Sequence, residues 1–460
     1  MTLPLAQTFA DWSSALTWAD VPEEVRRACR RAWLDCLGVT IAGGAHPSLR
    51  RLAAAQPRRK GPCSLALAGQ SDAASACLVN GMAAHAWDFD DTSYTGIMHG
   101  TALVFPVVLA LCEERGLSEG DALLALVVGS EVTYCLAEVC GHQHYFKGWW
   151  SSVTLGLVGA TAAAAKLMGL DPLATRHALA LAAAASGGGK AAFGSDAKPY
   201  LIGECARRAL GFAEAAAAGL TGPAEVFEDS RGFLALLNDG KSNPEEVEWL
   251  GKRWRLTDPG LFFKTSPVCS AAHAAIEATA TLLAKAGADW TQVAAIHAEV
   301  PDLVAVSLVY PDPITPQEAQ FSLPYALACS CLNGRVRLQD LAPEALQAAG
   351  ARRLMQKVTM QVADDLSSAA MRQRYPESAR VTLTLNSRER LDGFCGEAYG
   401  MPKNALTNRD LTKKFADCLA YAGSDDPGVS LETSDLLELA VEALSRRSRP
   451  LEVSQTGRST

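Results

Sequence analysis

Alanine recurs along the first half of the chain at the spacing of buried helix positions. Between Val21 and Gly260 alanine and leucine dominate with helical periodicity, and the runs at 178–185 and 213–218 are almost continuous. Alanine leaves little side-chain bulk between neighbouring helices, so such helices can approach closely and be covered on every side. Glycine residues end several of these runs, as they commonly end helices. We therefore expect a helical body with closely packed, buried central helices.

The pattern changes after Lys264. Three segments alternate apolar and polar residues and indicate half-buried strands, at 293–300, 357–362 and 379–385. From residue 406 the pattern is helical again. A chain of 460 residues exceeds what a single core usually supports. The sequence predicts a mainly α protein with an all-helical domain (1–264), an inserted smaller α/β domain (265–400) and a helical return (401–460), enclosing a cleft.

Charge and composition exclude several classes of partner. The formal net charge is −8 and no lysine and arginine stripe is present, which argues against nucleic-acid binding. The N-terminus lacks the basic start and apolar core of a signal peptide, and apolar runs such as 153–165 are shorter than a membrane span. We expect a soluble, cytoplasmic protein. A small anionic substrate remains possible, because a few converging cations suffice, with Lys198 and Lys264 as candidates.

The cysteines and the glycine-rich segment give no cofactor signature. Thirteen cysteines, an odd number, are scattered without a CxxC pair, so we predict small buried side chains and no metal site. The segment Ser186–Lys190 resembles a phosphate loop only superficially, because the leading glycine is missing and Ala191 follows the lysine. A glycine-rich stop between two helices is the better interpretation. We expect no cofactor.

Acidic and imidazole side chains crowd into the segment 80–99, which reads NGMAAHAWDFDDTSYTGIMH. Like charges this close push their pKa values apart, and groups perturbed in this way gather at catalytic or ion-binding sites. The alternative is a solvated acidic turn, in which some of the aspartates cap a helix. The segment contains two histidines and three aspartates: His85, His99, Asp88, Asp90 and Asp91.

Several motifs together resemble the MmgE/PrpD family over nearly the whole chain. They read NG-x-x-AH-x-x-DFDD from Asn80, K-x-x-P-x-C-x-x-x-H from Lys264 and AQFSLPY from Ala319, in that order. The family includes 2-methylcitrate dehydratases, cis-aconitate decarboxylases and iminodisuccinate epimerases. The resemblance implies a helical domain with an α/β lid domain, a homodimer, no metal, and a small di- or tricarboxylate substrate.

The resemblance also implies a set of catalytic residues: Asp88, His99, Tyr145 and Lys198. The family's reactions break a bond next to a carboxylate, and groups held in a dry cleft best stabilise the charge that develops. Each side chain also has an ordinary interpretation, as an exposed lysine, a capping or core histidine, or an interface aromatic. Residues 100–101 are glycine and threonine where the family usually has proline and serine, and one extra residue precedes His99.

Four further residues are expected to bind the substrate: Lys264, His273, Tyr310 and Trp150. Lys264 and His273 match positions in the family's motifs, and Tyr310 lies just before the PDP turn. Tyr310 and His273 could equally be packing residues. Trp150 marks the main departure, because residues 148–152 read GWWSS where most members have G-[FW]-H-P-T. An indole cannot shuttle a proton, so the pocket loses an acid or base and gains bulk.

Three functions follow from these features. The first is a lyase, either a dehydratase or a decarboxylase, in which His99, Lys198 or Tyr145 share the proton transfers. The second is an epimerase or isomerase, in which Tyr145 and Lys198 exchange a proton on opposite faces of a carbon. Trp150 favours this second function, which does not need the missing histidine. The third is a non-catalytic protein that binds carboxylates.

Overall fold

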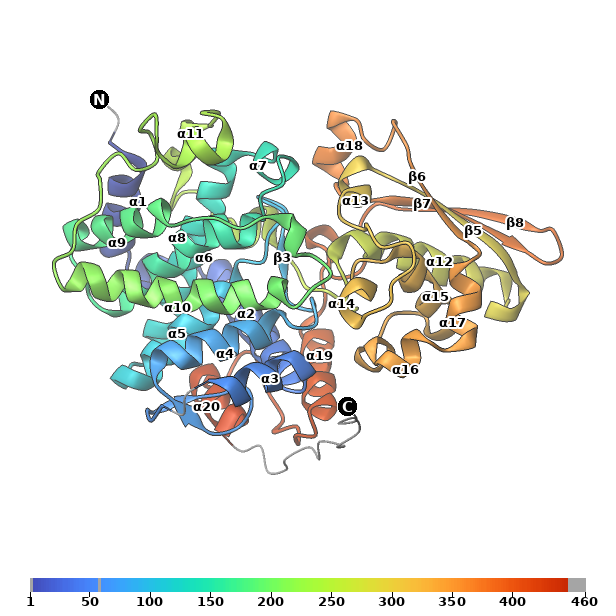
Figure 1. Ribbon diagram of the computed structural model, residues 1–460, viewed down its shortest axis with the longest axis horizontal. Coiled ribbons are helices and arrows are strands. Elements are labelled where there is room, and N and C mark those ends of the chain that lie inside the picture. The colour runs from blue at the N-terminus through green and yellow to red at the C-terminus, as the bar shows by residue number, and fades with distance from the viewer. Residues whose placement is uncertain (1–2, 57–58, 446–460) are drawn as a thin grey trace, which may run out of the picture.

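The computed structural model describes residues 3–56 and 59–445, and helices make up most of it (Figure 1). The helices of the first half are α1 (Leu5–Ala15), α2 (Glu23–Gly43), α3 (Pro47–Ala55), α4 (Ala73–His85), α5 (Thr101–Arg115), α6 (Glu119–Cys140), α7 (Gln143–Phe146), α8 (Ser151–Leu167), α9 (Pro172–Ala184), α10 (Ala197–Ala217) and α11 (Phe233–Asn238). The glycine-rich segment before Lys190 joins α9 to α10, as expected of a stop between helices.

The central helices α5, α6, α8 and α10 are buried and closely packed, as the alanine content predicts. A Cβ atom placed on Gly159 of α8 would lie 2.3 Å from the carbonyl oxygen of Gly129 in α6, so only glycine fits. Among the described helices, α6 alone is long and apolar enough to cross a membrane, but 89% of its apolar window is buried inside the protein. It is therefore placed as a core helix.

The second half contains the α/β part, at the right of Figure 1. Its sheet has the order β6-β5-β7-β8, with β5 and β6 parallel and the other pairs antiparallel. The strands are β5 (Val293–Val300), β6 (Val358–Val362), β7 (Ala379–Leu385) and β8 (Arg390–Cys395), and the helices are α12 (His273–Ala286), α13 (Asp302–Ala305), α14 (Pro316–Ala319), α15 (Leu323–Asn333), α16 (Pro343–Leu346), α17 (Ala349–Met355) and α18 (Ala369–Arg374).

The three predicted strands are present within one residue of their expected bounds. β5 and β7 alternate buried and more exposed side chains, whereas β6 is an edge strand whose side chains are mostly exposed. The fourth strand, β8, was not predicted, because RLDGFC alternates only weakly and contains a glycine.

The chain then returns to the helical part through α19 (Asn408–Tyr421) and α20 (Leu436–Ser445). α19 packs against α2, and Lys414 pairs with the buried Asp35 at 2.7 Å. The fold is thus mainly α with a smaller α/β part, as predicted. All thirteen cysteines lie in the described part, none is in a disulfide, and twelve are buried.

Candidate active site

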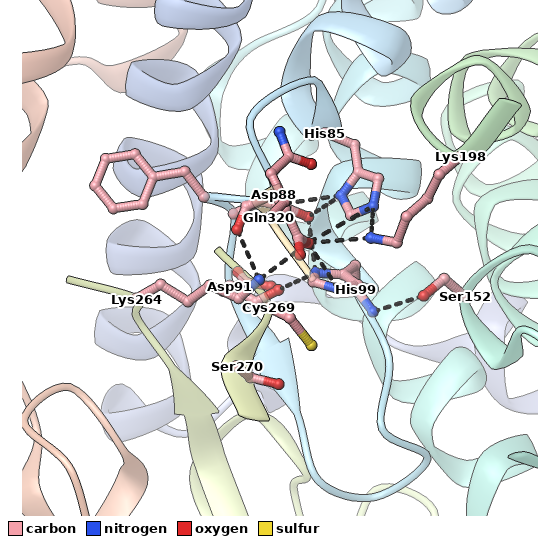
Figure 2. A network of polar contacts seen from close by, with 12 residues as sticks. His85, Asp88, Asp91, His99, Ser152, Lys198, Lys264, Cys269, Ser270 and Gln320 are labelled. Carbon is pink, nitrogen blue, oxygen red and sulfur yellow. Dashed lines mark hydrogen bonds and ion pairs between the residues drawn. The ribbon is translucent and has the colours of Figure 1, made fainter. Parts of the chain in front are cut away.

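The acidic segment is positioned by a short strand pair between distant parts of the chain. α4 ends at His85, and the backbone then turns through Asp88, whose φ of 48° is in the left-handed region. β3 (Thr92–Ser93) pairs with β4 (Leu261–Phe262), so Lys264 lies beside Asp88 (Figure 2). The aspartates are all buried, which excludes the solvated acidic turn.

Asp88 is held between two buried lysines. Its Oδ1 atom lies 3.0 Å from Nζ of Lys198 and 3.0 Å from Nζ of Lys264, and Lys264 also donates to the Asp88 carbonyl oxygen at 2.7 Å. Burial by itself raises a carboxyl pKa, but the two ammonium groups hold the pKa of Asp88 well below its ordinary value. Asp88 is therefore ionised and fixes both lysines.

The two lysines differ in how firmly they keep their protons. Burial and the neighbouring Lys264 lower the pKa of Lys198, although Asp88 opposes the shift. Burial also lowers the pKa of Lys264, but Asp88 and Asp90 outweigh it, and the net shift is upward. Lys198 is therefore the lysine that exchanges a proton more readily, while Lys264 stays an ammonium ion.

Aromatic rings surround the Lys198 ammonium group. Nζ lies 5.1 Å from the ring centroids of Trp150, Phe193 and Phe321. Aromatic faces attract a cation, and the attraction strengthens where water is excluded. The three rings thus hold the amine in place and keep its surroundings dry.

Asp90 orients both histidines of the segment. It accepts from Nδ1 of His85 at 2.8 Å, and one of its oxygens lies 3.0 Å from Nδ1 of His99. His99 Nδ1 also lies 2.9 Å from the carbonyl oxygen of Asp91, and its backbone amide donates to the Ser152 hydroxyl at 2.9 Å. These acceptors place the hydrogen of each imidazole on Nδ1.

Both imidazoles are neutral at ordinary pH. Burial lowers the pKa of His85 to about 4 against the opposing effect of Asp90, and burial also lowers the pKa of His99. His85 Nε2 accepts from the Lys198 ammonium group, which completes a chain from Asp90 through His85 to Lys198. The alternative in which aspartates of this segment cap a helix does not hold for Asp90 and Asp91, because the next helix, α5, begins only at Thr101.

The side chains of His85, Asp88, Asp90 and His99 form a group with the geometry of metal ligands, their ligating atoms lying within 4.8 Å of one another. The lysines argue against a cation at this place. Asp88 Oδ1 already pairs with two ammonium groups and His85 Nε2 with one, so a divalent ion would meet both positive charges at close range. The donor set fits internal pairing with lysine better than it fits a metal.

A cavity of about 20 Å³ lies at the centre of this network. Five of the predicted site residues line it: Asp88, His99, Tyr145, Trp150 and Lys198. Its volume holds roughly one water molecule, so a carboxylate substrate can enter only if the walls move apart.

Three predicted residues do not line this cavity. Lys264 pairs with Asp88, which does line it. Both ring nitrogens of His273 contact backbone groups. Nδ1 lies 3.2 Å from the Ser270 carbonyl oxygen, and Nε2 accepts from the Ser266 amide at 3.3 Å. Tyr310 donates to the Phe193 carbonyl oxygen at 2.9 Å and so contacts the backbone of a residue that lines the cavity.

The cavity also contains residues that the sequence analysis missed. Phe321 lies within the AQFSLPY motif, so a signal for it was present, and Phe193 follows the glycine-rich stop. Glu377 lines the cavity from the α/β part, between α18 and β7. Its neighbours in the sequence, PESAR, carry no recognisable motif.

Comparison with known proteins identifies the family of the chain. Residues 7–246 match the MmgE/PrpD N-terminal domain and residues 266–438 match the MmgE/PrpD C-terminal domain. The chain is 27% identical to the cis-aconitate decarboxylase of Mus musculus over 435 residues, covering 90% of this chain and 86% of the relative. It is 26% identical to the human cis-aconitate decarboxylase over 430 residues, with 90% and 88% covered.

A third relative is the cis-aconitate decarboxylase-like protein of Aspergillus oryzae, 26% identical over 470 residues, with 93% of this chain and 95% of the relative covered. The two matched domains together span almost the whole described chain. The chain therefore belongs to the MmgE/PrpD family and is an enzyme of that type.

Proposed function

We propose that the chain is a lyase, a decarboxylase or dehydratase, that acts on a small di- or tricarboxylate. The observation that carries the proposal is the buried Lys198, which is held by Asp88 and His85 and faces the cavity beside His99. The three relatives are named as cis-aconitate decarboxylases or a decarboxylase-like protein, which supports a lyase acting on that class of substrate.

The geometry suits cleavage next to a carboxylate. When a carbon–carbon or carbon–hydrogen bond breaks there, an electron pair is left on carbon and spreads onto the neighbouring carboxylate. Lys198 can stabilise this charge as an ammonium ion or accept a proton as an amine, because its pKa is lowered. Lys264 does not line this cavity, and we assign it the part of keeping Asp88 ionised and in place.

An epimerase is the second candidate, because Tyr145 and Lys198 line the same cavity. Burial raises the pKa of the Tyr145 phenol, whose hydroxyl lies 2.9 Å from that of Ser307. A phenol with a raised pKa keeps its proton and is a weak acid, whereas an epimerase needs a group that both gives and accepts a proton at each face. The lyase therefore remains the first proposal.

Proton NMR in heavy water tests the proposal, with citrate, 2-methylcitrate, cis-aconitate, malate and aspartate-derived diacids as substrates. A lyase removes substrate and produces new alkene signals, and Lys198→Ala removes this activity. Deuterium at a carbon next to a carboxylate, without loss of substrate, would replace the lyase by the epimerase. No change in any substrate would contradict both.

A further inference from the structure

Glu377 is a buried carboxyl group on the wall of the active-site cavity that the proposed chemistry has not used. It lies in the turn before β7 of the α/β part and is 1% exposed. Asp88 and Lys198 reach the same cavity from the helical part. The cavity thus has titratable groups supplied by both parts of the fold.

Two hydroxyl groups hold Glu377 in a fixed orientation. Tyr94 donates to Oε2 at 2.9 Å and Ser270 donates to Oε1 at 2.8 Å. Within the described part of the chain no lysine, arginine or histidine forms an ion pair with it. A buried carboxylate without a cation is costly, so the neutral acid is favoured.

The charged surroundings agree with a carboxyl group that holds its proton near neutrality. Burial raises the pKa of Glu377 to about 7, while the hydrogen bonds from Ser270 and Tyr94 and the charge of Lys264 lower it, and Asp88 adds to the rise. The Cys269 thiol nearby is neutral, because burial raises its pKa to about 12. Glu377 can therefore both give and accept a proton at working pH.

Apart from Lys198, to which the proposed chemistry gives the role of charge stabiliser or base, His99, Trp150 and Tyr145 on the cavity wall are poor proton donors. The His99 hydrogen is on Nδ1, which faces Asp90 and the Asp91 carbonyl, so Nε2 has none to give. Trp150 carries no transferable proton. Burial holds the pKa of Tyr145 above its ordinary value, which makes its phenol a weak acid.

We propose that Glu377 is the general acid of this enzyme, delivering a proton to the reacting substrate from the α/β side of the cavity. The assignment rests on the lyase function proposed above. In decarboxylation the carbon–carboxylate bond breaks, carbon dioxide leaves, and the electron pair stays on carbon. That carbon then takes the Glu377 proton, and the carboxylate is protonated again from water.

In dehydration the same proton goes to the departing hydroxyl group, which leaves as water. Lys198, as the amine, takes the carbon-bound proton, and the electron pair of that bond forms the new double bond. Proton transfer by a positioned acid contributes about 10²- to 10⁴-fold to a rate.

The test compares the wild type with Glu377→Gln, Glu377→Asp and Tyr94→Phe. We expect Glu377→Gln to lower kcat about 100-fold or more with KM changed less than threefold, and to remove the fall in activity above about pH 7. Glu377→Asp keeps the acid and recovers part of kcat. Tyr94→Phe lowers kcat less than Glu377→Gln does and moves the fall to higher pH, because a hydrogen bond that lowers the pKa of Glu377 is lost.

A kcat within threefold of wild type in Glu377→Gln, or a loss confined to KM, would overturn the assignment. The activity of the wild type distinguishes this failure from failure of the lyase proposal. The lyase proposal fails if the wild-type protein neither decarboxylates nor dehydrates any of the substrates. In that case a difference infrared titration of wild type against Glu377→Gln decides. A carboxyl band that titrates near pH 7 and is missing in the variant supports a proton-carrying Glu377, and one already ionised at pH 5 overturns it.

Discussion

Gly81 of α4 and Gly203 of α10 meet backbone to backbone, and a Cβ atom on Gly81 would lie 2.8 Å from the Cα atom of Gly203. α4 ends four residues later at His85, and Lys198 lies five residues before Gly203 at the start of α10. The close approach of the two helices therefore sets the distance at which His85 accepts from the Lys198 ammonium group. Small residues in the helical body thus allow close packing of the core and also position the side chains of the site.

Gly203→Ala tests this link. A Cβ atom there would lie 2.1 Å from the Leu78 carbonyl oxygen, so the helices must separate. We expect a loss of about 1–3 kcal/mol in the free energy of unfolding, together with reduced kcat. Denaturant unfolding and turnover of the same preparation measure both.

Gly211→Ala is the matched control in the same helix, because no atom lies within 4 Å of its added Cβ. It should keep activity and gain roughly 0.5–1 kcal/mol, since alanine is the better helix former. Equal effects of the two variants would refute a special role for the Gly81 contact.

Lys198→Ala and His99→Ala should each lower turnover at least about 10³-fold while the thermal unfolding transition stays in place. The fold tolerates the first change because Asp88 keeps its pairing with Lys264. The exposed Lys285→Ala, on α12, is the control and should behave as wild type. Steady-state kinetics and a thermal melt check the prediction, and near-normal turnover in either variant would remove that residue from the mechanism.

The sequence was enough to predict the fold class and several residues that line the cavity. It was not enough to predict the contacts that distant segments of the chain make with those residues. Hydrophobic alternation located β5, β6 and β7, and local crowding pointed to Asp88 and His99. The roles of Asp90 and Glu377 depend on which imidazole or hydroxyl lies opposite, and this is set by packing between segments far apart in the chain. His273 shows the converse, because a matching motif position proved to face backbone groups.

Glu377 also makes stability depend on pH. Its pKa is about 7 in the folded protein against 4.5 ordinarily, so the folded state holds the proton more tightly and stability falls as pH rises between these values. Relative to Glu377→Gln, which does not titrate, the wild type should lose about 3 kcal/mol of unfolding free energy from pH 4.5 to above pH 7. Denaturant unfolding of both proteins at pH 5 and pH 8 measures the change, and a constant difference would show that the carboxyl group is ionised throughout.

Trp150 is predicted to decide which product leaves the site. Its indole is 1% exposed, lies between His85 and Phe193 with ring centroids 5.6 and 5.8 Å away, and presents its face to the Lys198 ammonium group. Trp150→His removes that face, enlarges the cavity and places a second group able to transfer protons beside Lys198. We expect Trp150→His to raise the yield of dehydration or decarboxylation products relative to deuterium exchange without loss of substrate, as measured by proton NMR with the same substrate panel. Trp150→Phe removes bulk but adds no proton carrier, so it should enlarge the cavity without this shift. The same product ratio in all three proteins would mean that Trp150 only fills space.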